Sequence, residues 1–227
     1  MKDRLKKIFD KHTWLLNIVV AITYFLFGKL GFSLSEGSGF AALIWPAAGA
    51  ALGFVLFFGY RVWPGIYFGA LFSSFMKFDG DLSFDGIIEN NLHFFTISAG
   101  ATLQALATGW AVNRFNLFDH DFSNPRKVGL FFLIAGPISC TISTTIAFFT
   151  FYTLGLSSFY GLLSEWILWW ISDSTSTIIF ITLIFALFKF GKTRCNIIML
   201  VLGTALLVTF GMFYVGRSWE NDRLNLI

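Results

Sequence analysis

The sequence predicts an all-α integral membrane protein, a polytopic bundle of about seven transmembrane helices. Hydrophobic residues make up 56% of the 227 residues, Phe alone occurs 30 times, and the mean hydropathy is +0.71. Only 13% of the residues are charged, far fewer than a soluble domain of this length carries. A transmembrane helix needs about 20 apolar residues, and the chain offers such a run several times.

The seven predicted spans cover residues 14–34, 39–58, 62–78, 91–112, 128–154, 160–190 and 196–215. The fifth contains Gly136-Pro137, and we expect a kink there because a proline removes one helical hydrogen bond and crowds the preceding turn. The sixth is ~45 Å long at helical rise, which exceeds the ~30 Å hydrocarbon core. We expect its beginning at the outer interface, which amphipathic rings such as Trp166, Trp169 and Trp170 prefer.

The segment from Trp45 to Gly69 is the most distinctive part of the chain. Two apolar runs flank a short hinge that holds Arg61, and each run opens with a Trp-Pro pair and carries two glycines in GxxxG spacing. In lipid, this spacing lets backbones approach closely, so we expect a tight helical hairpin packed through its glycines. We expect the Trp-Pro pairs to begin the helices and Arg61 to anchor the hinge at the lipid phosphates. The architectural residues are Trp45, Pro46, Gly49, Gly53, Arg61, Trp63, Pro64, Gly65 and Gly69.

The loops alternate in charge along the chain. Twelve of the 16 Lys and Arg residues lie in the N-terminus and in the loops after the second, fourth and sixth spans, whereas the opposite loops are acidic. By the positive-inside rule the N-terminus is cytoplasmic, and seven spans then leave the C-terminus outside. We expect 1–12 to be a basic cytoplasmic segment, 13–216 the membrane domain, and 217–227 an outer loop that leads to a further span missing from an incomplete bundle.

Asp173 is the leading candidate for a functional residue. It lies near the middle of the sixth span, where an ionisable side chain is costly and is by default a functional hypothesis. The fifth span carries hydroxyls at a similar depth: Ser139, Thr141, Ser143, Thr144 and Thr145. The two patches could line one polar cavity. Alternatively, Asp173 is a structural carboxyl held by neighbouring hydroxyls, and the serines and threonines bond their own backbone.

Lys29 is the one cation well inside a predicted span. It either snorkels to the surface or pairs with Asp173 or Glu165, and a Lys–Asp pair facing outward predicts a site for a zwitterionic or anionic solute. Gln104 is expected to make an interhelical hydrogen bond. The predicted polar core consists of Asp173, Lys29, Gln104, Glu165, Trp169, Ser172 and Thr144.

The sequence predicts no catalytic residue, no cofactor and no metal site. It lacks the full phosphate-binding loop GxxxxGK[S/T], a Gly-x-Ser-x-Gly elbow and an HExxH motif, and no two histidines have metal-ligand spacing. Cys140 and Cys195 are expected on opposite halves of the membrane, which excludes a disulfide. Because the basic residues lie in short loops, we expect the lipid bilayer and no nucleic acid as a partner.

Four segments together resemble the bacterial membrane-associated sensor domain of the first type. They are GKLGFSLSEGSGFAALIWPAAG at 28–49, LFFGYRVWPGIYFGALFSSF at 56–75, SAGATLQALATGW at 98–110 and EWILWWISDSTSTI at 165–178. The resemblance implies an input module of the inner membrane, fused to a histidine kinase or to an enzyme of cyclic di-GMP metabolism. A related sensor kinase for external hexose phosphate works with a transporter-like membrane partner. The chain departs from the family pattern WxGDxxG at Ser172 and Ser176, and it has Gln104 where glutamate is frequent.

We therefore interpret the chain as a membrane sensory module that is not an enzyme and that signals to a fused or associated cytoplasmic domain, as a homodimer or with a transporter-like partner. A small transporter or permease is the main alternative, since broken helices and midplane polar residues are also transporter features. A structural or partner-binding subunit is the second alternative. Glycine faces exposed to lipid would favour that reading, whereas buried ones would favour internal packing.

Overall fold

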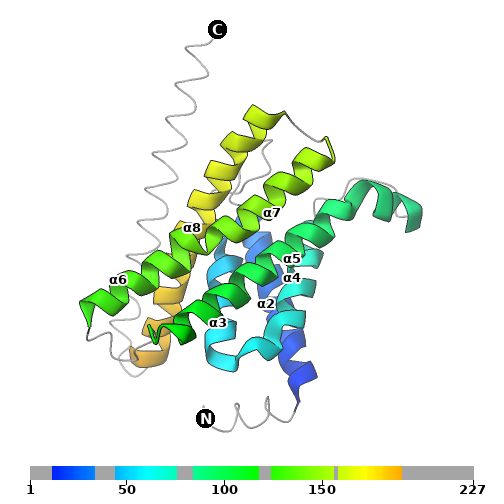
Figure 1. Ribbon diagram of the computed structural model, residues 1–227. Coiled ribbons are helices and arrows are strands. Elements are labelled where there is room, and N and C mark those ends of the chain that lie inside the picture. The colour runs from blue at the N-terminus through cyan, green and yellow to red at the C-terminus, as the bar shows by residue number, and fades with distance from the viewer. Residues whose placement is uncertain (1–11, 34–43, 76–83, 118–123, 156–157, 191–227) are drawn as a thin grey trace. The chain divides into compact units, whose positions relative to one another are not determined.

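The computed structural model describes residues 12–33, 44–75, 84–117, 124–155 and 158–190, and within these ranges every regular element is helical. The chain divides into two compact units, Met1–Phe180 and Ile181–Ile227, and all contacts discussed below lie within the first. The elements, shown in Figure 1, are α2 (Thr13–Ser33), α3 (Pro46–Phe58), the 3₁₀ turn η1 (Tyr60–Val62), α4 (Trp63–Phe75), α5 (Phe84–Arg114), α6 (Pro125–Leu133), the π-helical turn η2 (Ile134–Ile138), α7 (Cys140–Thr153) and α8 (Phe159–Phe190).

Three of the described helical stretches are long and apolar enough to cross a membrane: Thr13–Ser33, Pro125–Thr153 and Phe159–Ile184. They correspond to the first, fifth and sixth predicted spans. By contrast, α3 and α4 have 13 residues each, or ~20 Å at helical rise, which is shorter than the ~30 Å hydrocarbon core. Residues 39–43, 76–78 and the whole seventh predicted span lie outside the described residues. The count of seven spans therefore stays a prediction.

Both Trp-Pro pairs begin helices, as predicted. Pro46 is the first residue of α3, and α4 begins at Trp63 with Pro64 next. Proline is tolerated there because the first N–H groups of a helix have no intrahelical acceptor. Between the two helices, Gly59 adopts a left-handed φ of 80°, and the Nε of Arg61 donates to the carbonyl of Phe58 at 3.1 Å.

The prediction that the hairpin packs through its own glycines is wrong. A Cβ at Gly65 would lie 2.6 Å from the carbonyl oxygen of Asn17, and one at Gly69 would lie 2.7 Å from the Cβ of Tyr24, so α4 packs against α2. A Cβ at Gly49 would lie 2.6 Å from that of Phe180 on α8. The small residues do permit close approach, but to helices distant in sequence. Because these glycines are buried within one chain, they favour internal packing over assembly.

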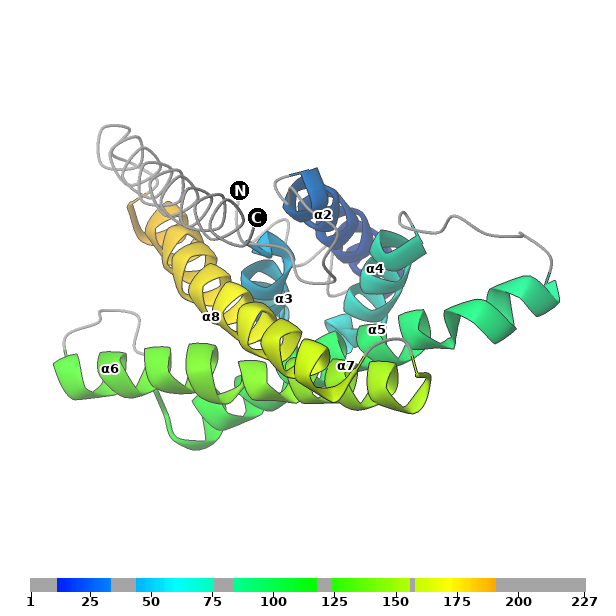
Figure 2. The ribbon, with the colours of Figure 1, turned by 90° about the horizontal axis from the view of Figure 1, so that it is seen from above.

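The core between α2, α3, α4 and α5 is apolar. Its buried members include Leu16 and Val20 of α2, Val55 of α3 and Ile66 of α4. Asn17 fixes the entry to α4, because its side-chain oxygen accepts from the N–H of Gly65 at 2.7 Å while its amide donates to the carbonyl of Arg61 at 3.1 Å. Helix α5 joins this group to α7, and the two helices lie side by side in Figure 2.

The irregularity predicted at Gly136-Pro137 takes the form of the π-helical turn η2. The N–H of Ser139 donates to the carbonyl of Ile134 at 3.1 Å, five residues back. The indole N–H of Trp170 donates to the carbonyl of Pro137 at 2.7 Å. Proline cannot donate to the helical ladder, and a single π turn lets the helix absorb this defect. The Trp170 contact ties the turn to α8.

Candidate functional site

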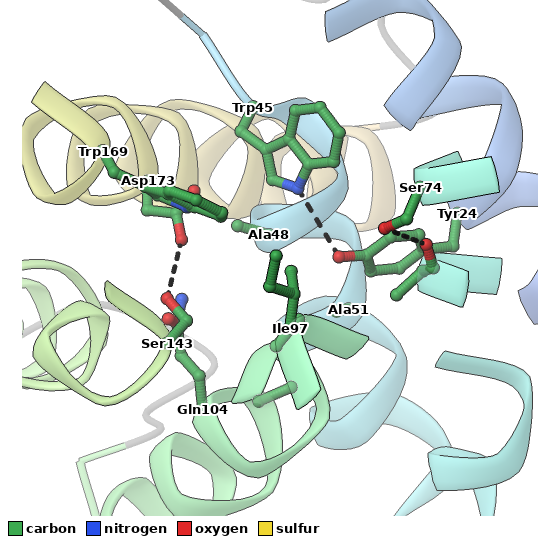
Figure 3. Close-up of a pocket in the computed structure, with 13 residues that line it drawn as sticks. Tyr24, Trp45, Ala48, Ala51, Ser74, Ile97, Gln104, Ser143, Trp169 and Asp173 are labelled. Carbon is green, nitrogen blue, oxygen red and sulfur yellow. Dashed lines mark hydrogen bonds between the residues drawn. The ribbon is translucent and has the colours of Figure 1, made fainter. Parts of the chain in front are cut away.

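A small, mainly apolar cavity of about 40 Å³ lies among α2, α3, α4, α5, α7 and α8. Figure 3 shows the side chains around it. Its polar and aromatic walls come from Tyr24, Trp45, Ser74, Gln104, Ser143, Trp169 and Asp173. Alanines of α3, α4 and α5 form much of the remainder. Their short side chains are the reason that space is left where six helices meet.

Asp173 is the acidic group of this cavity. The residue is only 3% exposed. Its Oδ2 accepts a hydrogen bond from the Ser143 hydroxyl at 3.1 Å, the contact drawn in Figure 3. Its Oδ1 is buried and has no hydrogen-bond partner. The structure thus joins the polar patches of the fifth and sixth predicted spans through one hydrogen bond, and it leaves half of the carboxyl unpaired.

Gln104 is the second polar group with an unpaired atom. The residue is 6% exposed, and its amide donates to the sulfur of Cys140 at 3.3 Å, which confirms the predicted interhelical hydrogen bond. Its Oε1 is buried without a partner. Gln104 and Trp169 lie close enough to interact with the Asp173 carboxyl, yet neither forms a hydrogen bond with Oδ1. An unpaired buried acceptor costs about 1–3 kcal/mol, so this arrangement favours an occupant that donates.

The aromatic wall is held by hydrogen bonds between helices. The Trp45 indole donates to the Tyr24 hydroxyl at 3.5 Å, and the backbone N–H of Trp45 donates to the Ser176 hydroxyl at 2.7 Å. The second bond satisfies a donor just before α3 and connects that helix to α8. Ser176 is one of the two serines at the glycine positions of the pattern WxGDxxG.

Several predicted polar-core residues do not reach the cavity. Lys29 is exposed on α2 and does not line it. In the part of the chain that the structure describes, no ion pair joins Lys29 to Asp173. Thr144 is buried but donates to the carbonyls of Cys140 and Thr141 in its own helix. This agrees with the alternative that the threonines of this span bond their own backbone. Ser172 is buried with its hydroxyl unpaired, and Glu165 is half-buried on α8; neither lines the cavity.

The sequence reasoning missed Tyr24 and Ser74, which line the cavity. It also missed two contacts outside the lining: Cys140 as the acceptor for Gln104 and Trp170 as the donor to Pro137. Tyr24 follows Leu16 and Val20 at intervals of four on the buried face of α2. A hydroxyl-bearing ring on such a face is the signal that could have identified it, because a buried Tyr hydroxyl needs a partner. Cys140 and Trp170 gave no comparable signal, since their roles depend on which helices meet.

The site carries no positive side chain to balance Asp173. Among the described residues that line the cavity, none is Lys, Arg or His. The N-terminal end of α3 supplies a partial charge of roughly +0.5, which does not cancel a carboxylate. A water molecule needs about 10–15 Å³ of such space, so the cavity has room for roughly three water-sized groups. The geometry suits a small, hydrogen-bond-donating occupant.

The comparisons with known proteins place these observations in one family. The family model MASE1, which describes a membrane-associated sensor domain found in histidine kinases and cyclic di-GMP enzymes, matches residues 16–214. No curated protein and no solved structure matches the chain. The match covers every described helix except the first residues of α2.

Proposed function

We propose that this chain, which belongs to the MASE1 family of membrane-associated sensor domains, is a sensory input module of the bacterial inner membrane. It passes a stimulus from within or outside the membrane to a cytoplasmic output, either a histidine kinase or an enzyme of cyclic di-GMP metabolism, that is fused to it or bound by it. The chain itself carries out no catalysis in this proposal. The output domain is the partner that the family implies.

The observation that carries the proposal is the cavity around Asp173. Its walls come from six helices, so an occupant that fills it contacts most of the described bundle at once. A ligand shifts an equilibrium between two packings only by its differential affinity for them. Unpaired oxygens on Asp173 and Gln104 supply that difference, because the packing in which both oxygens meet a donor gains free energy on binding.

The topology of the proposed module is seven spans with the N-terminus in the cytoplasm. The alternation of basic and acidic loops supports this orientation. A single cysteine placed at position 2 of a chain whose two native cysteines are replaced tests it with a thiol reagent that does not cross membranes. We expect protection in intact cells and labelling after lysis, whereas labelling in intact cells would overturn the orientation.

A small transporter is the second candidate function, and one observation favours it. Helix α3 begins at Pro46, directly after the cavity residue Trp45. Helices that start at a polar site within the membrane are a feature of transporters. A transporter must open its site alternately to both sides, whereas a sensor needs only two packings that an output domain can distinguish.

The proposal is tested by measuring whether the cavity controls an output. The full chain is joined, through one added transmembrane helix, to a cytoplasmic cyclic di-GMP-forming domain, and cyclic di-GMP is measured in cells. Asp173→Asn keeps the size of the side chain and removes its charge. We expect it to change the output several-fold, because the balance between the two packings depends on the carboxyl.

The matched control is Thr175→Ala, two residues further along α8 at an exposed position. We expect this variant to give the output of the unchanged chain at equal membrane abundance. Equal output from the Asp173→Asn chimera and the unchanged chimera, at equal abundance, would refute the coupling. If neither Asp173→Asn nor Thr175→Ala changed the output, the transporter would be the better hypothesis.

A further inference from the structure

We propose that the cavity beside Asp173 binds a small organic cation, a primary ammonium ion of about three non-hydrogen atoms. The inference rests on the proposed function in that it names the class of stimulus for the same cavity, but it concerns binding alone. The sequence predicted a zwitterionic or anionic ligand, on the assumption that Lys29 pairs with Asp173. With Lys29 exposed elsewhere on α2, that assumption falls.

The charge of the site selects a cation. Among the described lining residues, Asp173 is the one carboxylic acid, and none has a cationic side chain. The partial positive charge at the start of α3 is roughly half a unit, so the sum stays negative when the carboxyl is ionised. Removing a charge from water without a partner is costly, and a bound cation supplies the missing partner.

The unpaired atoms select a donor. Asp173 Oδ1 and Gln104 Oε1 are both buried acceptors without a hydrogen-bond partner, and both residues line the cavity. A proton on Oδ1 would turn that oxygen into a donor but would leave the space unfilled. The ammonium group of a primary amine has three N–H donors, which is enough for both oxygens and for one water or hydroxyl.

The aromatic and aliphatic walls select an organic cation over a metal ion. Rings of Tyr24, Trp45 and Trp169 line the cavity together with Ile97 and several alanines. Aromatic faces attract ammonium groups, and the apolar part of the lining can pack against an alkyl chain, which a metal ion does not have. The volume of about 40 Å³ corresponds to roughly three water-sized groups, which matches ethylammonium.

The test uses the full chain in lipid nanodiscs, titrated with ethylammonium chloride and followed by intrinsic tryptophan fluorescence. Trp45 and Trp169 lie in the cavity wall, so an occupant changes their surroundings directly. We expect a saturable change with ethylammonium that sodium chloride at the same concentration does not produce. Tetraethylammonium, which is too large for the cavity, serves as the size control and is expected to give no saturable change.

Two variants and one control locate the binding site. Asp173→Asn is expected to weaken ethylammonium binding about tenfold or more, because a hydrogen bond to a charged group is lost. Gln104→Met keeps the length of the side chain, removes the unpaired acceptor, and is expected to weaken binding about fivefold. Ser172→Ala removes an unpaired hydroxyl that lies outside the cavity lining and is expected to keep the affinity.

Saturation by sodium as well as ethylammonium, or unchanged affinity in Gln104→Met and in a folded Asp173→Asn, would overturn the inference. No saturable response of the unchanged chain would overturn it as well. These outcomes are separate from those of the chimera, because a cavity that controls output without binding ethylammonium would keep the sensory proposal and reject only this ligand class.

Discussion

The interface between α2 and α4 and the cavity beside α8 are built on opposite principles. At the first, a Cβ on Gly69 would lie 2.7 Å from the Cβ of Tyr24 and 2.8 Å from the carbonyl oxygen of Ala21, so no space remains between the helices. At the second, space remains and two buried oxygens have no partner. The comparison separates a rigid contact that holds the bundle from a site that keeps unpaired polar atoms at a cost in stability.

The difference follows from what the membrane offers as a driving force. Lipid tails are as apolar as the side chains, so helices associate through close van der Waals packing and hydrogen bonds between them. The α2–α4 contact uses both, since glycines bring the backbones together and Asn17 bonds the start of α4. At the cavity, the helices are less closely packed and two buried oxygens make no hydrogen bond. A protein keeps such a site where function outweighs stability.

The largest effect is expected at the rigid contact. Gly69→Leu puts a side chain where even a Cβ meets backbone atoms of α2, and we expect a loss of about 3 kcal/mol in the free energy of unfolding. Unfolding by a denaturing detergent, followed by circular dichroism, measures it.

The matched control for this glycine is Gly129→Ala on α6, where a Cβ would meet no atom within 4 Å. It is expected to be neutral or slightly stabilising, because alanine has the higher helix propensity. If Gly69→Leu were as stable as this control, the α2–α4 contact would not be the close packing described here.

The sequence predicted the helical class of the described residues, the starts of α3 and α4, and the irregularity at Pro137, because each depends on local rules. Trp-Pro pairs and a mid-helix proline act through their own backbone. The partners of the glycine faces were not predictable in this way. The GxxxG spacing of Gly65 and Gly69 indicates that a helix approaches closely, but it does not say which one. Choosing α2 over α3 requires the packing of the whole bundle.

A smaller effect, with the opposite sign, is expected in the cavity. Asp173→Asn keeps an oxygen that can accept from the Ser143 hydroxyl and removes the buried charge of the carboxylate, so we expect the free energy of unfolding to rise by about 2 kcal/mol. The same detergent unfolding measures it. A loss of stability instead would mean that the carboxyl is the structural group of the alternative hypothesis, held by the Ser143 hydroxyl.

The candidate site was predictable in its centre and not in its surroundings. Asp173 and Gln104 stand out because polar groups are costly at that depth, and their spans could be aligned from the loop charges. Lys29 was misplaced for a physical reason. Which side of α2 faces the bundle depends on the contacts of Leu16, Val20 and Tyr24, and Lys29 lies on the exposed side of the helix.

The smallest expected effect sharpens the comparison within α8 itself, where two nearby buried serines differ in their hydrogen-bond partners. Ser176 accepts from the N–H of Trp45 at 2.7 Å, whereas the buried hydroxyl of Ser174 has no hydrogen-bond partner. Ser176→Ala should therefore lower the free energy of unfolding by about 1 kcal/mol, since it leaves the Trp45 donor unsatisfied at the start of α3. Ser174→Ala should be neutral or slightly stabilising. Equal effects of the two substitutions would show that the hydrogen bond between Trp45 and Ser176 does not hold α3 to α8. Trp45 could then shift in the cavity wall without a loss of stability.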